Sequence, residues 1–537
     1  MPAIAERLPA AAAARPSLLP LLALGLCAPT LVPLLATAWA WTQPDPDTVA
    51  HLARHVLPRA GAQSAWLVLG VSTGAALLGT ALAALVALTE FPGRRFYAWA
   101  LLLPLVLPGY VMAVALIGLF DTAGPVARLA QALGIGAWFE FRSRGGIILT
   151  LTLSLYPYVY LVAREAFARQ GGRAMEAARV LGLGPWQAFR RAALPLARPA
   201  IVAGTLLVAM ETLADFGTAA AFNHDTLTTA IYKAWFGLQS VDAALRIGGV
   251  LLLCVLAIAV AEARWRAPRR YTAVGAAPVA RIALGRSGIV ASGFCGLVLA
   301  CALVVPVARL AWSALPRLAQ LDSRWLVYAL DSALLGVAAA LLTVAAALAI
   351  EFAARERPGA ATATAQRLAG LGYGLPGALL AVGLYVPIMG LSNRLADATG
   401  IDVVLHGGLA LLLVAYGVRF TAVAQATVGS ALARVRPAVT ESARTLGAGP
   451  ARLATAVYAP LLRGGLVTGA LLVFVDTIKE MPITLMMRPF GWDTLATRLF
   501  ELTSEGQWAD AAVPALAIGV AGILPVWWLE RRSRDEA

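Results

Sequence analysis

The sequence predicts an all-α polytopic membrane protein, with about 12 transmembrane helices arranged as two parallel six-helix repeats. Three observations support this fold class. Only 13% of the 537 residues are charged and 60% are apolar, with a mean hydropathy of +0.76, which no soluble domain of this length requires. Apolar runs recur along the whole chain. One polar segment occurs twice, 265 residues apart.

Each predicted span is a mostly apolar run of about 20 residues, enough for a helix to cross a hydrocarbon core of ~30 Å. The fifth and eleventh runs also carry acidic residues. We expect the first run to be retained as a span, because it is longer than the apolar core of a cleavable signal peptide. The twelve runs cover residues 18–41, 64–88, 97–120, 147–165, 199–220, 245–263, 288–313, 330–352, 368–392, 406–428, 464–487 and 509–529.

Arginine is distributed unevenly between the two sides of these predicted helices. Six arginines and no acidic residue lie in 264–288, and seven arginines accompany two glutamates in 164–198. The segments 42–63 and 486–508, on the other side, are nearly balanced. The positive-inside rule therefore predicts that the arginine-rich segments and both termini are cytoplasmic. The net charge of +14 follows from this asymmetry and does not indicate a nucleic-acid partner.

The arginine-rich stretch at the middle of the chain divides it into two halves with six predicted spans each. We expect a first transmembrane domain at 1–263, a cytoplasmic linker at 264–288 and a second transmembrane domain at 289–537. The duplicated segment takes the same place in both, after the fourth span of each half.

The duplicated segment aligns 176–212 with 441–477 without a gap, and 16 of 37 positions are identical. Because both copies lie on the same predicted membrane side, the repeats are parallel and related by an axis along the membrane normal, which predicts a pore or gated cavity between them. Shorter echoes support the duplication: they pair Thr89-Glu90-Phe91 with Ile350-Glu351-Phe352, and Pro108-Gly109 with Pro376-Gly377.

Each copy predicts two short helices joined by a Gly-Pro turn, within loops at 170–200 and 435–465. Gly182 can end the first helix in a left-handed conformation, and Pro185 suits the first turn of the next. An amphipathic helix lying on lipid headgroups is the alternative. Two gapless copies with the same glutamate, glycines and prolines favour a docking element for a partner, since lipid binding needs no fixed Gly-to-Pro spacing.

The sequence Glu-Ala-Ala, with a glycine six residues after the glutamate and a later Leu-Pro, resembles the EAA loop of ATP-binding-cassette (ABC) importer permeases. In that family the loop forms coupling helices that dock into cytoplasmic ATPase subunits, in the type I importer fold. The second copy departs from the first by Ala459 in place of Leu194, and by a serine in place of the first alanine. The resemblance implies that the coupling residues are Glu176, Ala177, Ala178, Gly182 and Pro195, with Glu441, Ser442, Ala443, Gly447 and Pro460.

The resemblance also implies partners. No GxxxxGK[ST] phosphate-binding loop occurs in the sequence, so we expect ATP hydrolysis on two copies of a separate ATPase subunit. No catalytic Ser/His/Asp set occurs either, so the chain is expected to be a transport subunit without enzymatic activity or a cofactor. A periplasmic substrate-binding protein and the bacterial inner membrane complete the implied setting. A secondary transporter or a channel is the rival class, and neither needs a doubled ATPase-docking loop.

Two further segments resemble the corresponding stretches of fused ferric-iron permeases, which import iron(III) delivered by a periplasmic binding protein. They run from Glu211 to Phe236 and from Asp476 to Ala496. Thiamine and polyamine permeases share the coupling loop but resemble these segments less. The sequence therefore favours ferric iron as the substrate, with thiamine, a polyamine or an inorganic anion as alternatives.

The acidic residues in these segments are candidates to line the pathway. Counting from the start of each span near 199 and 464, Glu211 and Asp476 lie about 12 residues in. At 1.5 Å per residue this depth is ~18 Å, close to the bilayer centre. Carboxylates at that depth are costly in lipid, so they are expected to face the bundle interior or water.

Asp215 and Glu480 are expected one helical turn further on the same face as these two acids. A hard trivalent cation suits oxygen ligands, although the sequence predicts no firm metal site. The alternative is structural: Lys479 would neutralise Asp476 or Glu480, and the acids would lock helices together.

Overall fold

The computed structural model describes residues 18–121, 124–134, 140–266, 281–319, 322–400, 405 and 407–535. Over these residues the chain is almost entirely helical, and one pair of two-residue strands is present. The all-α prediction is confirmed. Its physical reason is that a backbone in lipid must satisfy its own hydrogen bonds, which a helix does within one segment.

The first repeat begins with two helices in line and contains both long spans and short connecting helices. Its α-helices are α1 (Leu19–Cys27), α2 (Leu31–Thr42), α3 (Pro46–His51), α4 (Leu57–Leu88), α5 (Arg94–Ala100), α6 (Gly109–Phe120), α7 (Pro125–Ala132), α8 (Arg144–Ala166), α9 (Gly172–Val180), α10 (Pro185–Ala188), α11 (Leu194–Ala214), α12 (Gly217–Ala221), α13 (Leu227–Tyr232) and α14 (Val241–Arg266). Short 3₁₀ or π-helical segments join some of them: η1 (Ala28–Thr30), η2 (Leu52–Val56), η3 (Leu103–Val106), η4 (Phe167–Gly171), η5 (Phe189–Ala193) and η6 (Lys233–Gly237).

The second repeat follows the same order. Its α-helices are α15 (Ser287–Leu299), α16 (Val305–Leu318), α17 (Arg324–Glu356), α18 (Ala360–Gly374), α19 (Gly377–Thr399), α20 (Leu409–Ala433), α21 (Pro437–Thr445), α22 (Pro450–Arg452), α23 (Ala459–Leu461), α24 (Arg463–Lys479), α25 (Pro482–Met487), α26 (Leu495–Ser504) and α27 (Ala512–Asp535). The π-helical segments are η7 (Ala300–Val304) and η8 (Leu453–Tyr458).

Within the described residues, ten helices are long and apolar enough to cross a membrane. An eleventh span results if Leu453–Leu461 and Arg463–Lys479, which meet at a bend of 76°, are counted together. The twelfth predicted run corresponds to the shorter apolar helix Ala512–Ile523. The prediction of about 12 helices in two repeats therefore agrees with the structure.

The third and ninth predicted spans are broken at equivalent points. α6 starts directly after Pro108, and α19 starts directly after Pro376. The residue before each proline is extended, with ψ of 112° at Leu107 and 126° at Leu375. A proline disfavours helical conformation in the preceding residue and removes a backbone donor. The sequence predicts continuous spans here, and the breaks correct that prediction by placing two helix starts inside the molecule.

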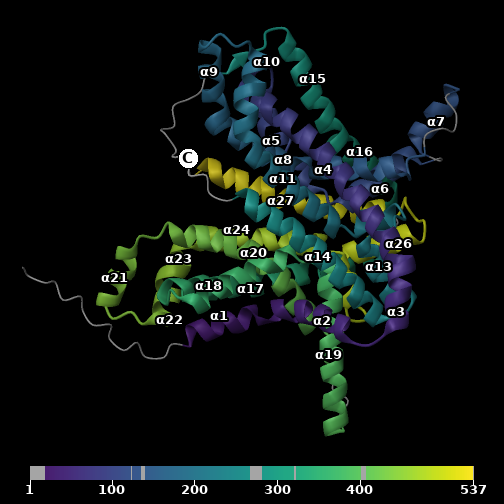
Figure 1. Ribbon diagram of the computed structural model, residues 1–537, viewed down its shortest axis with the longest axis vertical. Helices are drawn as coiled ribbons and strands as arrows, with labels where there is room; N and C mark the ends of the chain where they lie inside the picture. The colour runs from purple at the N-terminus through teal and green to yellow at the C-terminus, as the bar shows by residue number, and fades with distance from the viewer. Residues whose placement is uncertain are drawn as a thin grey trace, which may run out of the picture.

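The first span of each repeat packs against the other repeat. α1 contacts α17 and α18, α2 contacts α19, and in the second repeat α16 contacts α6. In Figure 1 the purple helix α1 accordingly runs beside the green helices α17 and α18. The thiol of Cys27 donates a hydrogen bond to the carbonyl of Ala365 at 3.2 Å. The two repeats are therefore interlocked.

The repeat extends to buried polar side chains. Thr226 and Thr494 form capping boxes at the starts of α13 and α26. The next backbone N–H in each repeat donates to a serine hydroxyl on the long helix of the same repeat, from Leu227 to Ser64 and from Leu495 to Ser332, at 3.0 and 2.9 Å. Such matched capping shows that the duplication conserves local hydrogen bonding as well as helix order.

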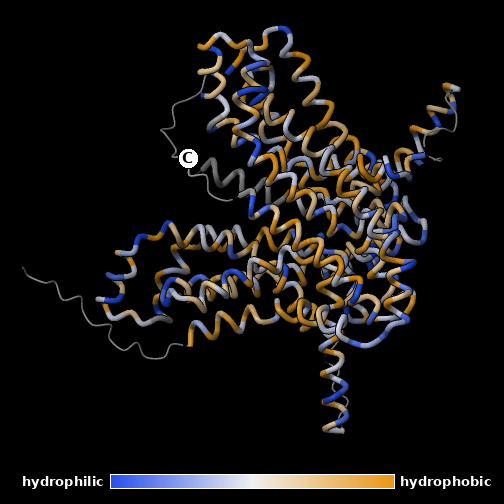
Figure 2. The backbone as a smooth tube through the Cα atoms, viewed as in Figure 1, coloured by the Kyte–Doolittle hydropathy of each residue, from blue (hydrophilic) through white to orange (hydrophobic). Residues whose placement is uncertain are grey.

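The two duplicated loops lie at the same end of the molecule, where the helices of the two repeats diverge (Figure 1). Hydrophilic residues gather at these loop tips and at the connections of the opposite end, while the helices between them are mostly hydrophobic (Figure 2). This banding is what a protein that crosses a bilayer requires.

The segment that joins the repeats returns to the end of α4. β2 (Ile282–Ala283) pairs in parallel with β1 (Thr89–Glu90), and Arg281 lies 3.8 Å from the carboxylate of Glu90. Most of the predicted linker, residues 267–280, lies outside the described residues.

Candidate functional site: two exposed loops and a central acidic cavity

The first duplicated loop folds as two short helices around a left-handed glycine. Gly182 follows α9 with a φ of +88°. Its N–H donates to the carbonyl of Arg179 at 2.9 Å, and the N–H of Leu183 donates to that of Ala178 at 3.1 Å. These two bonds close the end of α9 in the manner of a glycine C-cap. Pro185 then opens α10, as the sequence predicts.

The second loop repeats this geometry around Gly447, whose φ is +81°. The N–H of Gly447 donates to Arg444 at 2.9 Å, and that of Ala448 donates to Ala443 at 3.0 Å. Within the described part of the chain, a Cβ built on either Gly182 or Gly447 meets nothing within 4 Å. Each glycine is therefore required by its backbone conformation and not by crowding.

Large apolar side chains are exposed at the tips of both loops. Val180 and Leu181 are 88% and 83% exposed, and Leu446 is 84% exposed. Trp186, on α10, is 69% exposed. Contiguous exposed apolar side chains of this kind are typical of surfaces that bind a protein or a membrane.

Some of the predicted coupling residues lie on the surface of the loops, and others lie where the loops join the neighbouring helices. Ala177, Glu441 and Ser442 are exposed, while Ala178 is buried and Glu176 lines a small pocket beside Ile282. Ala443 is half-buried, and the two prolines lie in the first turns of the helices that lead back from the loops, Pro195 in α11 and Pro460 in α23.

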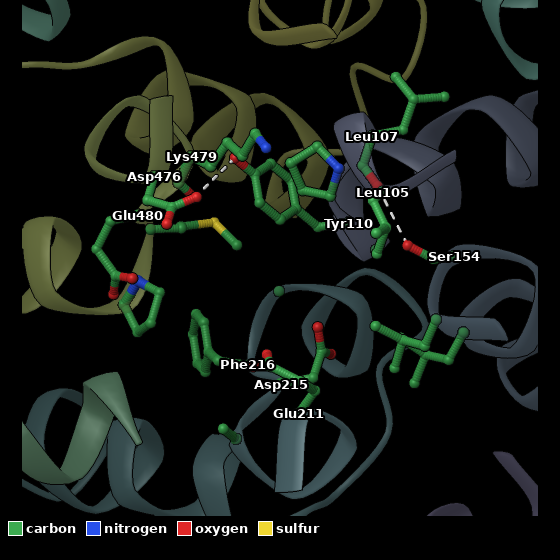
Figure 3. Close-up of a pocket in the computed structure, with 18 of the residues that line it drawn as sticks. Leu105, Leu107, Tyr110, Ser154, Glu211, Asp215, Phe216, Asp476, Lys479 and Glu480 are labelled. Carbon is green, nitrogen blue, oxygen red and sulfur yellow. Dashed lines mark hydrogen bonds between the residues drawn. The ribbon is translucent and has the colours of Figure 1, made fainter. Parts of the chain in front are cut away.

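All five predicted pathway residues line one cavity of about 210 Å³ between the repeats. Glu211 and Asp215 of the first repeat lie across it from Asp476, Lys479 and Glu480 of the second (Figure 3). The remaining wall includes Pro108, Gly109, Tyr110, Ser154, Tyr158, Tyr373, Arg419 and Pro482. The cavity lies where the broken helices α6 and α19 approach the ends of α11 and α24.

Asp215 lies just beyond α11, and not on it as the sequence predicts. The helix ends at Ala214, and the carboxylate turns to the start of α12. It accepts hydrogen bonds from the N–H groups of Thr218 and Ala219 at 3.0 and 3.1 Å and from the Thr218 hydroxyl at 2.9 Å. A helix start leaves such N–H groups unpaired, so Asp215 stabilises α12 while it faces the cavity.

Glu480 occupies the equivalent position after α24. Its Oε1 accepts a hydrogen bond from the N–H of Ile483 in α25 at 3.2 Å. Its Oε2 lies 3.1 Å from Nε of Arg419 on α20, and the two side chains are 7% and 15% exposed. The ion-pair partner of Glu480 is therefore Arg419 and not Lys479. Lys479 interacts electrostatically with Asp476 instead, which is the other pairing that the structural alternative allows.

Glu211 and Asp476 lie in the last turns of α11 and α24 and face the cavity. Within the described part of the chain their carboxylates accept no hydrogen bond and interact with neighbouring charges only electrostatically. They are therefore the two acids of the cavity that are not committed to a helix cap.

Arg419 is a charged residue of the cavity wall that the sequence analysis did not select. Its signal was present, because it is the only charged residue in the predicted span 406–428, and an intramembrane charge indicates a functional site. Its Nη1 donates to the carbonyl of Leu375 at 2.8 Å, directly before the break in the ninth span. Whereas these contacts of Arg419 stay within the second repeat, Tyr110 links the two repeats, because its hydroxyl donates to the carbonyl of Lys479 at 3.1 Å.

The glycine at each helix break allows a close approach to the capping acid. A Cβ on Gly377 would lie 2.6 Å from Oε1 of Glu480 and 2.8 Å from Cγ of Pro482. A Cβ on Gly109 would lie 2.5 Å from Oγ1 of Thr218. These distances are too short for any side chain, so the Pro-Gly sequences fix the cavity wall in both repeats.

We expect Gly377→Ala to destabilise the protein by about 1–3 kcal/mol, because the added methyl group overpacks the wall against Glu480. The measurement is thermal unfolding of the purified protein. Gly374→Ala is the matched control, since its Cβ would meet only Met210 Cε at 3.6 Å. Equal unfolding temperatures for the two variants would contradict the required close approach.

Residues 48–263 and 345–532 match the family of binding-protein-dependent transport system inner membrane components. The chain belongs to this family. It is therefore an ABC transporter permease, and the two matched stretches correspond to the two repeats. The resemblance of the chain to ABC importer permeases is confirmed at the level of the family.

Relatives of this permease differ in how much of the chain they cover. An Fe(3+)-transport system permease protein of Haemophilus influenzae is 26% identical over 523 residues, which is 95% of this chain and 96% of the relative. A putative 2-aminoethylphosphonate permease of Salmonella paratyphi A is 31% identical over 24% of the chain and 49% of the relative. A molybdenum permease of Mycobacterium bovis is 33% identical over 29% of the chain and 60% of the relative.

Proposed function

We propose that this permease translocates ferric iron, delivered by a periplasmic binding protein and driven by ATP hydrolysis on two separate ATPase subunits. The main observation in favour of ferric iron as the substrate is the negative charge of the cavity between the repeats. Among its lining residues are four carboxylates and two cations, Arg419 and Lys479, which leaves a formal charge of −2. Negative potential lowers the barrier that a low-dielectric interior presents to a cation. The full-length similarity to an Fe(3+) permease supports the same substrate.

The duplicated loops are proposed as the two ATPase-docking elements, one for each subunit. Two features support this role: the exposed apolar tips at Leu181 and Leu446, and the matched glycine caps that hold both loops in one conformation. ATP would be hydrolysed on the partners, in keeping with a membrane subunit that lacks a phosphate-binding loop.

The proposed topology places the loops, both termini and the linker 264–288 in the cytoplasm, with transmembrane domains at 1–263 and 289–537. The arginine distribution supports this orientation in a bacterial inner membrane. The surface at the opposite end of the molecule then faces the periplasm and meets the binding protein.

An oxyanion is the second candidate substrate, because Arg419 and Lys479 are present in the cavity and partial relatives transport molybdenum or 2-aminoethylphosphonate. The test is uptake into proteoliposomes that contain the permease together with a candidate ATPase and a candidate binding protein. We expect ATP-dependent uptake of radiolabelled iron(III) that requires all three components. Uptake of molybdate or a phosphonate, with no iron uptake, would overturn the substrate proposal.

A further inference from the structure

The two repeats hold their helix breaks with different side chains. In the first, the Ser154 hydroxyl of α8 donates to the carbonyl of Leu107 at 3.1 Å. In the second, Nη1 of Arg419 on α20 donates to the carbonyl of Leu375 at 2.8 Å. Both carbonyls directly precede a Pro-Gly break. Arg419 therefore takes the place of Ser154 and adds a positive charge to the cavity wall.

This substitution makes the cavity electrostatically unequal. Among the lining residues, the second repeat contributes both cations, Arg419 and Lys479, and these lie on the same wall as its two acids. The first repeat contributes Glu211 and Asp215 and no cation. The formal charge of −2 therefore belongs to the wall of the first repeat, where Asp215 is committed to capping α12 and Glu211 is not.

Arg419 is anchored at one end only. Its Nη1 is hydrogen-bonded to Leu375, but its Nε has no hydrogen-bond partner among the residues that the structure describes, although it lies 3.1 Å from Oε2 of Glu480. The contact with Glu480 is thus a charge contact without the aligned hydrogen bonds of a bidentate arginine–carboxylate pair. A guanidinium held in this way can move away from Glu480 while it keeps its hydrogen bond to the carbonyl of Leu375.

A transport pathway needs a site that a substrate can enter and also leave. Four carboxylates around a small cavity attract a trivalent cation strongly, because each adds to the attraction in a medium of low dielectric constant, even though no three acids of the described residues are placed to ligate one metal ion together. A fixed positive charge beside one of them reduces that attraction. Its position on the second repeat leaves the opposite wall open to the cation.

We propose that Arg419 is a tethered counter-ion that occupies Glu480, holds the affinity of the cavity for cations low, and leaves Glu211 as the principal transient cation ligand. The inference rests on the proposed transport of a cation. Arg419 would then be a specificity-determining residue, and the cation would bind transiently at the wall of the first repeat.

The test is titration of the purified full-length permease in lipid nanodiscs with Tb³⁺, a hard trivalent probe. Tyr158 and Tyr373 in the wall can sensitise its luminescence.

We expect Arg419→Gln to raise the Tb³⁺ affinity at least tenfold, and Glu211→Gln to lower it. Arg309→Gln is the matched control: Arg309 also lies in a predicted span and donates to a backbone carbonyl, that of Gly118, but it does not line the cavity. An unchanged affinity in folded Arg419→Gln protein overturns the proposal.

Removing Arg419 leaves Glu480 buried without its partner, which can prevent folding. The double variant Arg419→Gln with Glu480→Gln removes both charges and carries the test independently. We expect its Tb³⁺ affinity to stay near that of the wild type, because the two charges offset each other. A tenfold change in either direction contradicts the proposal. If no iron uptake is measured while the Tb³⁺ affinity still rises in Arg419→Gln, the role of Arg419 as a counter-ion is supported and ferric iron is rejected as the substrate.

Discussion

Glu211→Gln is expected to reduce iron uptake at least tenfold while the transport complex still assembles and its ATPase is still stimulated by the loaded binding protein. The change keeps the size of the side chain and removes one negative charge from the cavity wall. Because this carboxylate caps no helix and accepts no hydrogen bond within the described part of the chain, little structural cost accompanies its loss. A tenfold effect corresponds to ~1.4 kcal/mol of barrier.

Uptake per assembled complex is the quantity to measure, alongside ATP hydrolysis in the same proteoliposomes. Asp397→Asn, which neutralises an exposed carboxylate in α19 outside the cavity and the coupling loops, is the control and should behave as wild type. An undiminished rate in Glu211→Gln would make that acid a structural residue and remove the main physical support for a cation substrate.

The second large effect is expected at the coupling loops. Gly182→Val combined with Gly447→Val should abolish binding-protein-stimulated ATP hydrolysis and transport while the permease still inserts and folds. Both glycines have a left-handed φ, which a β-branched residue adopts only at a cost of about 1–3 kcal/mol. The cost falls on the turn that orients the exposed tips, so each loop should rearrange without disturbing the membrane helices.

A matched pair two residues further along separates this strain from mere bulk. Gly184 and Gly449 have no positive φ, and a Cβ on either meets nothing within 4 Å. Gly184→Val with Gly449→Val should therefore retain stimulated ATP hydrolysis. Full stimulation in the double valine variant would show that these loops do not transmit ATP hydrolysis to the permease.

The sequence predicts well those features that depend on local sequence patterns. Apolar runs define the spans, and the gapless repeat with its glycines defines the two loops, because a left-handed turn needs glycine wherever it occurs. Glu211 and Asp476 lie on helices, as the sequence predicts, for the same reason: the apolar runs that contain them form the regular helices α11 and α24. All five acidic and basic candidates line the cavity.

The features that the sequence predicts poorly depend on contacts between distant segments. Counting along a helix places Asp215 on α11, but the helix ends one residue earlier and the carboxylate caps the next helix. Lys479 is adjacent in sequence to Glu480, yet the partner is Arg419 on another helix, 61 residues away in sequence. Such pairings follow from tertiary geometry, which no local pattern encodes.

The interlocked first spans have a consequence for biosynthesis. α1 packs on α17 and α18, and the residue that accepts the Cys27 hydrogen bond follows it by 338 positions. A ribosome making 5–20 residues per second delivers that partner roughly 20–70 seconds after Cys27 itself. During this interval α1 lies in the membrane with lipid, or an insertion factor, in place of its native neighbours. Assembly of this permease is therefore completed only when the second half has been synthesised, and a chain that stops at the linker leaves its first helix without a docking surface.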